Sequence, residues 1–424
     1  MELMKQHTHE LGGLRVHIIP TTKYKTNTLV LRLKAPLCEE TVTERALLPY
    51  VLQSATKEHP SVLKVRQYLE ELYGASLVVD VSKKGEEHVI SLYMDVANEV
   101  YLQDSTPLFE KALAMLAKVL LQPAAEGEAF LQSIVESEKR ALVQRIEATL
   151  DDKMRYANER LIEEMCKVEA YRFSANGQKE KVSSITKDSL YACYKRVLAE
   201  DEMDLYIIGD VAENTADLVR QYFSISPRQP REKKVLLHKR SEKEQEIVEK
   251  QELKQSKLNI GYRTYITYRD EDYFALQLFN GLFGGFSHSK LFVNVREKNS
   301  LAYYAASRYE SHKGLLFVMS GIEAKNYEKA VTIIKEQMKA MQDGEFSEDD
   351  MSQTKSMIKN QILETIDTPR GLMELLYHGV VAGYDRPVEE WVTKVDSVTK
   401  EEVIKVANHI ELDTIYFLHG TEGA

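Results

Sequence analysis

The chain has 424 residues, of which 43% are hydrophobic and 29% are charged, and its formal net charge at pH 7 is −10. This length exceeds what one hydrophobic core usually supports, so the sequence predicts two or more globular domains. The acidic balance argues against a general role in nucleic-acid binding, which would require a basic face.

The N-terminus and the cysteines indicate the compartment. Residues 1–7 lack the apolar core of a signal peptide, and the sequence contains no run of 18 apolar residues. The three cysteines, Cys38, Cys166 and Cys193, are scattered and odd in number, which is typical of free thiols in a reducing compartment. We therefore expect a cytoplasmic protein that has no membrane segment.

Strands and helices are mixed along the first half of the sequence. Strand-like segments come first, at residues 14–19, 28–33, 77–81 and 88–94. Helix-like stretches follow, at residues 107–121, 128–150 and 154–168. Hairpins beside long helices, without regular alternation of strand and helix, predict an α+β fold in which helices cover one face of an antiparallel sheet.

The second half repeats this plan. Residues 184–188 (SITKD) are echoed by residues 397–401 (SVTKE), and each copy leads through a helix-like stretch to an apolar strand that ends at Gly209 or Gly420. Ser or Thr before an acidic residue is also an ordinary helix start. The agreement of motif, order and spacing favours two similar domains that arose by internal duplication.

A charged segment separates the two predicted domains. Residues 226–253 contain two prolines and dense charge, which do not form a buried element, although Val235–Leu237 could add a short edge strand. The sequence therefore predicts an N-terminal domain at residues 1–225, a linker at residues 226–253 and a C-terminal domain at residues 254–424.

The C-terminal domain has a glycine-rich turn before an arginine and a tyrosine. The turn includes Gly284, Gly285, Phe286 and Ser287, and Arg296 and Tyr303 follow it seven residues apart. Glycines here either line a substrate cavity or permit positive φ in a tight bend. Guanidinium and phenol groups are hydrogen-bond donors that can hold a peptide carbonyl.

Catalytic motifs of other classes are absent from the sequence. The eleven histidines form neither His-Glu-x-x-His nor His-x-x-Glu-His, and no phosphate-binding loop or nucleophile elbow is present. Arg296 and Tyr303 therefore resemble half of an active site.

The duplicated α+β plan, the Leu-Phe-Gly-Gly-Phe-Ser turn and the Arg-Glu-Lys-x-x-Leu-Ala-Tyr segment together resemble the M16 metallopeptidases, the pitrilysin, insulinase and mitochondrial-processing-peptidase family. The resemblance extends over essentially the whole sequence. It departs from the active pattern at the zinc site, because Ala46 and Tyr50 stand where the two histidines would be and Pro49 stands where the general base would be. Alanine and proline offer no donor atom, and tyrosine is a poor zinc ligand.

The distal zinc ligand of the family is a glutamate on a later helix. Aligned on Ile146 and Asp151-Asp152, this ligand falls near Gln144 or Arg145, and only a shifted alignment brings Glu138 or Glu147 into its place. One carboxylate does not make a zinc site, so the resemblance implies that this protein holds neither a catalytic zinc nor another cofactor.

Arg296 and Tyr303, in contrast, match the family residues that help to hold substrate and stabilise charge on the scissile carbonyl. The structural alternative is that Arg296 pairs with a carboxylate and Tyr303 fills the core. The family includes two-subunit enzymes in which one subunit holds zinc and the other does not. The resemblance therefore implies a non-catalytic subunit that contributes Arg296 and Tyr303, and half of a peptide-binding chamber, to a zinc-bearing partner.

The same resemblance links paired members in Gram-positive bacteria to the 5-aminopentanol modification of translation factor EF-P. The rival hypothesis belongs to another class of protein. In it the molecule is a catalytically silent peptide-binding or structural protein, as a homodimer or otherwise, with no share in catalysis.

Overall fold

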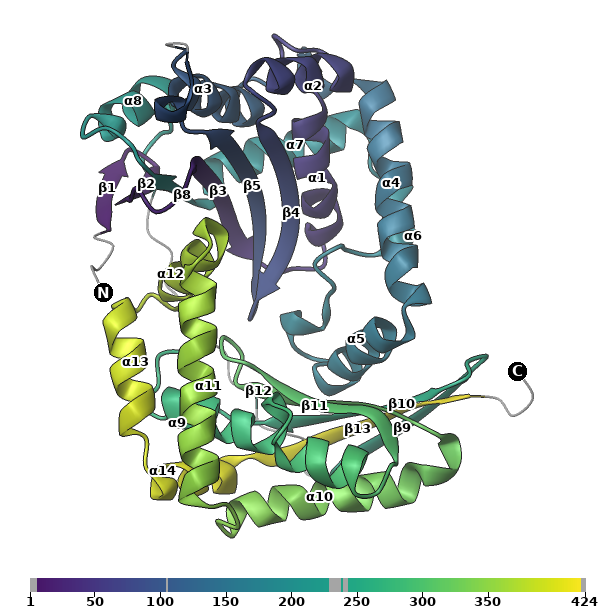
Figure 1. Ribbon diagram of the computed structural model, residues 1–424. Coiled ribbons are helices and arrows are strands. Elements are labelled where there is room, and N and C mark those ends of the chain that lie inside the picture. The colour runs from purple at the N-terminus through teal and green to yellow at the C-terminus, as the bar shows by residue number, and fades with distance from the viewer. Residues whose placement is uncertain (1–5, 104–105, 229–237, 239–242, 421–424) are drawn as a thin grey trace. The chain divides into compact units, whose positions relative to one another are not determined.

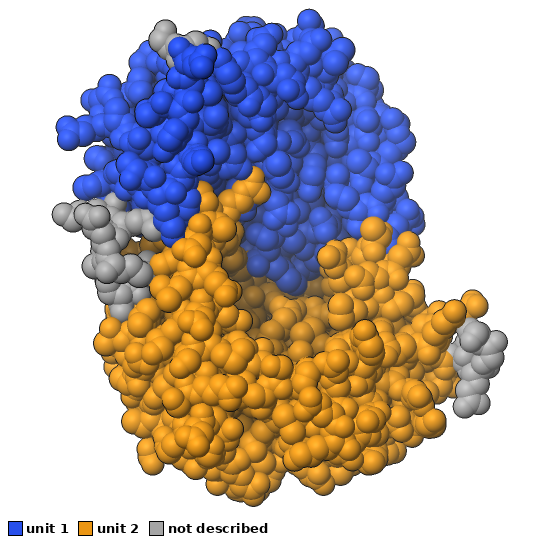
Figure 2. Space-filling model, viewed as in Figure 1, with its two compact units in different colours: residues 1–83, 87–147, 173–232 blue, residues 84–86, 148–172, 233–424 orange. Residues whose placement is uncertain are grey.

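The computed structural model describes residues 6–103, 106–228, 238 and 243–420. The protein forms two compact units (Figure 2). Unit 1 comprises residues 1–83, 87–147 and 173–232, and unit 2 comprises residues 84–86, 148–172 and 233–424. Residues 148–172, which the sequence assigned to the first domain, thus cluster with unit 2. Much of the predicted linker, including Val235–Leu237, lies outside the described residues.

Unit 1 is built on a six-stranded sheet with the order β1-β2-β8-β3-β5-β4 (Figure 1). The strands are β1 (His7–Leu11), β2 (Leu14–Pro20), β3 (Thr26–Pro36), β4 (Ser76–Lys84), β5 (Glu87–Ala97) and β8 (Glu202–Gly209). β3 is antiparallel to both of its neighbours, whereas β2 runs parallel to β8. A separate two-stranded ribbon joins β6 (Ala125–Glu126) and β7 (Ala129–Phe130).

Helices cover one face of the unit 1 sheet. They are α1 (Val42–Ser54), α2 (Val62–Glu71), α3 (Leu108–Leu121), α4 (Gln132–Asp151), α6 (Lys179–Val182), α7 (Lys187–Glu200) and α8 (Thr215–Tyr222). Side chains alternate between the two faces of a strand, so Leu29, Leu31 and Leu33 of β3 enter the same core as Leu47 of α1 and Leu116 of α3. Burial of this apolar surface is the main force that holds the helices on the sheet.

Unit 2 contains a five-stranded sheet with the order β11-β12-β10-β13-β9. Its strands are β9 (Gln245–Gln251), β10 (Ser256–Arg263), β11 (Ala302–Glu310), β12 (Leu315–Ile322) and β13 (Glu411–Gly420). The helical elements are α5 (Lys153–Met165), η2 (Ala170–Arg172), α9 (Tyr273–Asn280), α10 (Tyr327–Gln342), α11 (Glu348–Ile366), α12 (Pro369–Ala382), α13 (Val388–Ser397) and α14 (Lys400–His409).

The unit 2 sheet has helices on both faces. α9, α10 and α14 pack together on one face, and α5 lies against β10 and β13 on the other (Figure 1). Gly261 of β10 permits the approach of α5, because a Cβ atom at this position would lie 2.6 Å from Sδ of Met165. Leu161 of α5 joins Phe317 and Leu418 of the sheet in a small second core.

The two sheets repeat one plan, as the duplication predicts. Reading from β4 in unit 1 and from β11 in unit 2, the five strands of unit 2 each have a counterpart in unit 1, and β1 is an additional edge strand of unit 1. The parallel pairs, β2 with β8 and β9 with β13, are equivalent. Thr186 and Thr399 of the echoed motif both cap the helix that precedes the equivalent strands β8 and β13, each through a reciprocal capping box. The predicted α+β class with two similar, antiparallel-rich sheets is confirmed. The predicted helix cover on a single face describes unit 1 but not unit 2, where α5 packs on the second face of the sheet, and each sheet also contains one parallel pair.

Across the described residues, every helix is too short or too polar to cross a lipid bilayer.

Candidate functional site

The glycine-rich segment is a continuation of α9 rather than an open turn. α9 leads directly into a π-helical segment, η3 (Gly281–Gly285). Neither Gly284 nor Gly285 has positive φ. Close packing accounts for Gly284 instead, since a Cβ atom there would lie 2.5 Å from Oγ of Ser307 and 2.7 Å from its backbone nitrogen. The segment is therefore pressed against strand β11.

A second π-helical segment, η4 (Phe292–Glu297), brings Arg296 to the start of β11. The turn between them is closed by two backbone hydrogen bonds, from the Leu301 nitrogen to the Val295 oxygen (3.0 Å) and from the Ser300 nitrogen to the Arg296 oxygen (3.1 Å). Ser300 has a φ of 50°, a strained value for a residue other than glycine. π-helical turns and local strain are both frequent at functional sites.

The Arg296 side chain is exposed, and its guanidinium carbon lies 4.6 Å from the centre of the Phe292 ring. Within the described part of the protein it forms no ion pair and no side-chain hydrogen bond. The structural alternative, in which Arg296 pairs with a carboxylate of its own subunit, is therefore not what the structure shows. Phe292 contacts the guanidinium, and the hydrogen-bond donors of Arg296 stay available.

Tyr303 is the extra residue of a β-bulge in β11. The pairing of β11 with β12 shifts between Ala302 and Tyr304, which leaves Tyr303 without a partner in the ladder. A bulge redirects a side chain, and Tyr303 is 78% exposed. Like Arg296, it makes no hydrogen bond with the side chain of any described residue. The alternative that Tyr303 fills the core does not hold.

The remaining predicted site residues lie at the end of η3. Gly285 and Ser287 are exposed, whereas Gly284 is buried and Phe286 is half-buried, with its ring stacked on His288 at 5.7 Å. His288 in turn shares a hydrogen bond of 2.8 Å with Thr354 of α11. β11 contacts both π-helical segments, and it is the edge strand of the sheet.

The degenerate metal motif lies on α1 in unit 1. Ala46 and Pro49 are buried in α1, and Tyr50 is half-buried on the same helix. The guanidinium carbon of Arg145, from α4, lies 3.5 Å from the centre of the Tyr50 ring. Burial raises the pKa of Tyr50, and the charge of Arg145 partly offsets this. The two helices thus meet through a cation–π contact at the positions where the family pattern would place metal ligands.

A different group of three side chains that could bind a metal lies in unit 2. Donor atoms of Glu86, Glu169 and His238 come within 4.8 Å of one another. Lys313 already pairs with both glutamates, at 2.7 Å and 2.9 Å, and Arg263 pairs with Glu169 at 2.6 Å. Because the carboxylates already form ion pairs with these two cations, the cluster is an ion-pair network and does not suggest a metal centre.

Comparison with known proteins shows the family. A family model described as "Peptidase M16 inactive domain" matches residues 184–358. The sequence is 53% identical to the "Probable inactive metalloprotease YmfF" of Bacillus subtilis, over 100% of this protein and 99% of that one. On this evidence the chain belongs to the M16 peptidase family and is related to its inactive members.

More distant relatives include the "Uncharacterized zinc protease YmfH" of B. subtilis, which is 29% identical over 43% of this protein and 40% of that one. Among solved structures, a conserved protein from Enterococcus faecalis has a TM-score of 0.92 and 35% identity, over 99% of both proteins. A peptidase M16 inactive domain from Pseudomonas fluorescens has a TM-score of 0.81 at 17% identity, over 99% of this protein and 98% of that one, and supports the fold alone.

Several residues that shape the site were not visible in the sequence. Ser307 of β11 packs closely against Gly284, and its hydroxyl donates a hydrogen bond to Oδ1 of Asn280 at 2.8 Å. Phe292 supports Arg296, and Arg145 covers Tyr50. The spacing of Phe292 and Arg296, four residues apart on a helical segment, was the one local signal that could have indicated a contact.

Proposed function

We propose that this protein is the non-catalytic subunit of a heterodimeric M16-type zinc peptidase. In this proposal it binds no catalytic zinc or other cofactor of its own, forms part of the peptide-binding chamber and contributes Arg296 and Tyr303 to the active site of a zinc-bearing partner. The observation that supports the proposal best is the pair of exposed donors at the start of edge strand β11, which have no side-chain partner among the described residues.

The α1–α4 contact supports the first part of the proposal. Ala46 and Pro49 offer no ligand atom, and the positive charge of Arg145 lies on Tyr50, the third position of the motif. A divalent cation placed there would be repelled by the guanidinium, and Ala46, Pro49 and Tyr50 supply none of the nitrogen, sulfur or carboxylate ligands that zinc prefers. Glu138 of α4 is near Tyr50 but accepts a hydrogen bond from the Ser54 hydroxyl at 3.0 Å. We therefore expect no zinc at this position and assign the zinc to the partner.

The surroundings of β11 support the second part. An edge strand presents unpaired N–H and C=O groups that can bind an extended peptide by strand addition. A guanidinium and a phenol beside such a strand can donate hydrogen bonds to a peptide carbonyl, and these bonds strengthen as the oxygen gains negative charge. The fixed bulge and the strained Ser300 reduce the reorganisation needed to place these donors.

The proposal is tested in a mixed complex of this protein with a zinc-bearing M16 homologue. Arg296→Ala should lower kcat/KM for peptide cleavage by roughly 100-fold, the usual effect of removing one donor to a developing oxyanion. Tyr303→Phe, which removes only the hydroxyl, should also lower kcat/KM. Arg66→Ala is the matched control, because Arg66 is an exposed arginine on α2 in unit 1.

Complex formation and the zinc content of the partner should be the same for all variants. If both variants keep full cleavage but lose affinity for the peptide, the rival function, a catalytically silent peptide-binding protein, replaces the proposal. If neither activity nor peptide affinity changes, Arg296 and Tyr303 have no role in substrate handling. A cytoplasmic location, and a setting in EF-P modification with 5-aminopentanol, remain predictions from the sequence and its resemblance.

A further inference from the structure

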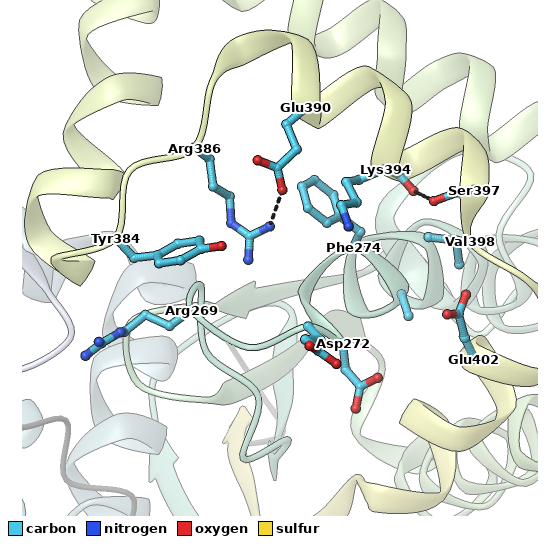
Figure 3. Close-up of a pocket in the computed structure, with 12 residues that line it drawn as sticks. Arg269, Asp272, Phe274, Tyr384, Arg386, Glu390, Lys394, Ser397, Val398 and Glu402 are labelled. Atoms are coloured by element: carbon cyan, nitrogen blue, oxygen red, sulfur yellow. Dashed lines mark hydrogen bonds and ion pairs between the residues drawn. The ribbon is translucent and has the colours of Figure 1, made fainter.

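A pocket of about 370 Å³ lies in unit 2, between the α12–α13 connection, the segment before α9, and α13 with α14 (Figure 3). Its volume is at the lower end of the range for small-ligand sites, roughly 300–1,000 Å³. Its lining is mostly charged: Arg269, Glu271, Asp272, Arg386, Glu390 and Lys394 all contribute. None of these residues belongs to the site proposed at β11.

Arg386 is the central residue of the pocket. It is only 8% exposed, and its guanidinium carbon lies 4.9 Å from the centre of the Phe274 ring and 5.0 Å from that of Tyr384. Figure 3 shows the guanidinium between these two rings, with Glu390 on its own side of the pocket and Arg269 and Asp272 on the opposite side. A charged group this deeply buried requires hydrogen-bond partners to offset its loss of hydration.

The partners of Arg386 leave one donor unused. Nη2 donates to the backbone oxygens of Tyr268 (3.0 Å) and Asp270 (3.3 Å), and Nη1 lies 3.5 Å from Glu390. Nε is buried and has no acceptor among the described residues. An unused N–H on a buried guanidinium is a specific position for an oxygen acceptor, because buried donors are almost always satisfied.

The other charges of the pocket fit an anionic group. Arg269 and Lys394 are exposed and form no side-chain contact with a described acidic residue. Two of the acidic residues are engaged: Asp272 pairs with Lys405 at 2.8 Å, and Glu402 accepts a hydrogen bond from the Thr399 nitrogen at 2.8 Å. The unengaged donors are therefore on three cationic side chains, which together favour a carboxylate.

We propose that this pocket binds a carboxylate group, with Nε of Arg386 as the central donor and Arg269 and Lys394 as flanking charges. Two sources have this chemistry: a small free amino acid, and the C-terminal residue of a peptide. Phe274 and Tyr384 would pack against the apolar part of either ligand. Glu271, which is near Lys405 but forms no close ion pair with a described cation, would additionally attract the ammonium group of a free amino acid.

The experiment is isothermal titration calorimetry on the full-length protein with four probes: L-leucine, L-leucinamide, N-acetyl-Ala-Leu with a free carboxylate, and the same dipeptide with a C-terminal amide. We expect at least one carboxylate probe to bind at concentrations up to about 10 mM, with its amide counterpart at least about tenfold weaker. Binding of L-leucine alone identifies a free amino acid as the ligand, and binding of the dipeptide acid alone identifies the C-terminus of a peptide.

Variants assign the binding to the pocket. Arg386→Gln should lower the affinity for the probe that binds by roughly tenfold to 100-fold, the usual effect of losing a hydrogen bond to a charged group. Because Arg386 is buried, its substitution could also disturb the fold. Arg269→Ala and Lys394→Ala therefore provide a second test on exposed residues, and each should lower the affinity for the same probe severalfold. Arg66→Ala is the matched control and should leave binding unchanged, since Arg66 is an exposed arginine on α2 and lies outside the pocket lining.

Three results would overturn the proposal: no binding of either carboxylate probe, equal binding of acid and amide, or binding that both exposed-residue variants leave intact. The Arg386, Arg269 and Lys394 variants separate binding in this pocket from peptide binding at β11, so failure of this proposal is distinguishable from failure of the peptidase proposal. Cleavage by the mixed complex does not enter the measurement.

Discussion

His88 shows at the scale of one residue how burial fixes a protonation state. Its ring is fully buried in β5, Nε2 lies 2.9 Å from the Ala175 carbonyl, and Nδ1 lies 3.2 Å from Nε of Arg45. The carbonyl can only accept and the guanidinium can only donate, so His88 is the neutral Nε2–H tautomer. Burial, and then the charge of Arg45, lower the pKa of His88 to about 3, against the weaker opposing effect of the Ala175 hydrogen bond.

This shift predicts acid sensitivity of unit 1. Between about pH 6.5 and pH 3 the unfolded protein binds a proton at His88 that the folded protein does not, so stability falls as the pH is lowered through this window. The slope from this one group is at most about 1.4 kcal/mol per pH unit. His88→Gln, which can keep both hydrogen bonds, should remove that part of the slope. Hydrogen exchange of β5 amides measured over the upper part of this window tests it, and equal slopes for the two proteins would refute this assignment.

The Tyr50–Arg145 contact shows which part of the metal motif could be predicted from single residues. Ala46, Pro49 and Tyr50 exclude ligands by their chemistry, and the alignment pointed to Gln144 or Arg145 on α4, where Arg145 is the residue that contacts Tyr50. The sequence did not reveal that Arg145 stacks on Tyr50. A cation–π contact depends on the separation and rotation of two helices, and neither is encoded in local spacing.

At the scale of elements, a buried ion-pair network joins the segment after α5 to the unit 2 sheet. Glu169 is 4% exposed and pairs with Arg263 of β10 and with Lys313 of the β11–β12 hairpin. Arg263 also pairs with Asp413 of β13 at 2.9 Å. Burial raises the pKa of Glu169, but the hydrogen bonds from Arg263 and Lys313 more than offset this and hold it below its usual range. The carboxylate is therefore charged at neutral pH.

Removing this charge should destabilise unit 2. Glu169→Gln leaves two buried cations undercompensated, and we expect a loss of roughly 3 kcal/mol in the free energy of unfolding. Trp391 is the only tryptophan of the sequence and lies in unit 2, so its fluorescence during chemical denaturation reports this unit. Glu323→Gln is the matched control, because the Glu323–Lys325 pair is mostly exposed and should contribute little to stability. Equal effects of the two substitutions would contradict the assigned role of the network.

The elements around β11 show where sequence patterns stop being informative. The spacing from Gly284 to Tyr303 predicted that the segment is special, but not that it contains two π-helical turns and a β-bulge. A π-helical turn and a β-bulge each insert one extra residue into a regular hydrogen-bond ladder. The side chains around them therefore do not follow the helical period of about 3.6 residues or the strand period of about 2 on which sequence interpretation depends. The close contact of Gly284 with Ser307 likewise joins residues that lie far apart in the sequence.

At the scale of the whole molecule, the internal repeat was the most reliable prediction. The two capped helices at Thr186 and Thr399 and the strands after them occupy equivalent places in two sheets that share the order of five strands. The assignment of α5 to unit 2 could not be predicted, because Lys153–Met165 has the amphipathic pattern of any surface helix. Which sheet such a helix covers depends on long-range packing, here on the absence of a side chain at Gly261.

The two duplicated units differ in what each could contribute to an active site. One M16 unit has a motif without metal ligands, and the other has exposed donors without a catalyst. An enzyme assembled from two such subunits needs a complete zinc motif only once. The proposal therefore concerns the pair, and it predicts properties that the isolated subunit does not have.

The most direct test measures zinc content and peptide cleavage for this protein alone, for a zinc-bearing M16 homologue alone and for their stoichiometric mixture. The proposal predicts no stoichiometric zinc and no cleavage for this protein, and cleavage by the mixture that is at least about tenfold above that of the homologue alone. Stoichiometric zinc together with peptide cleavage in the isolated protein would contradict it.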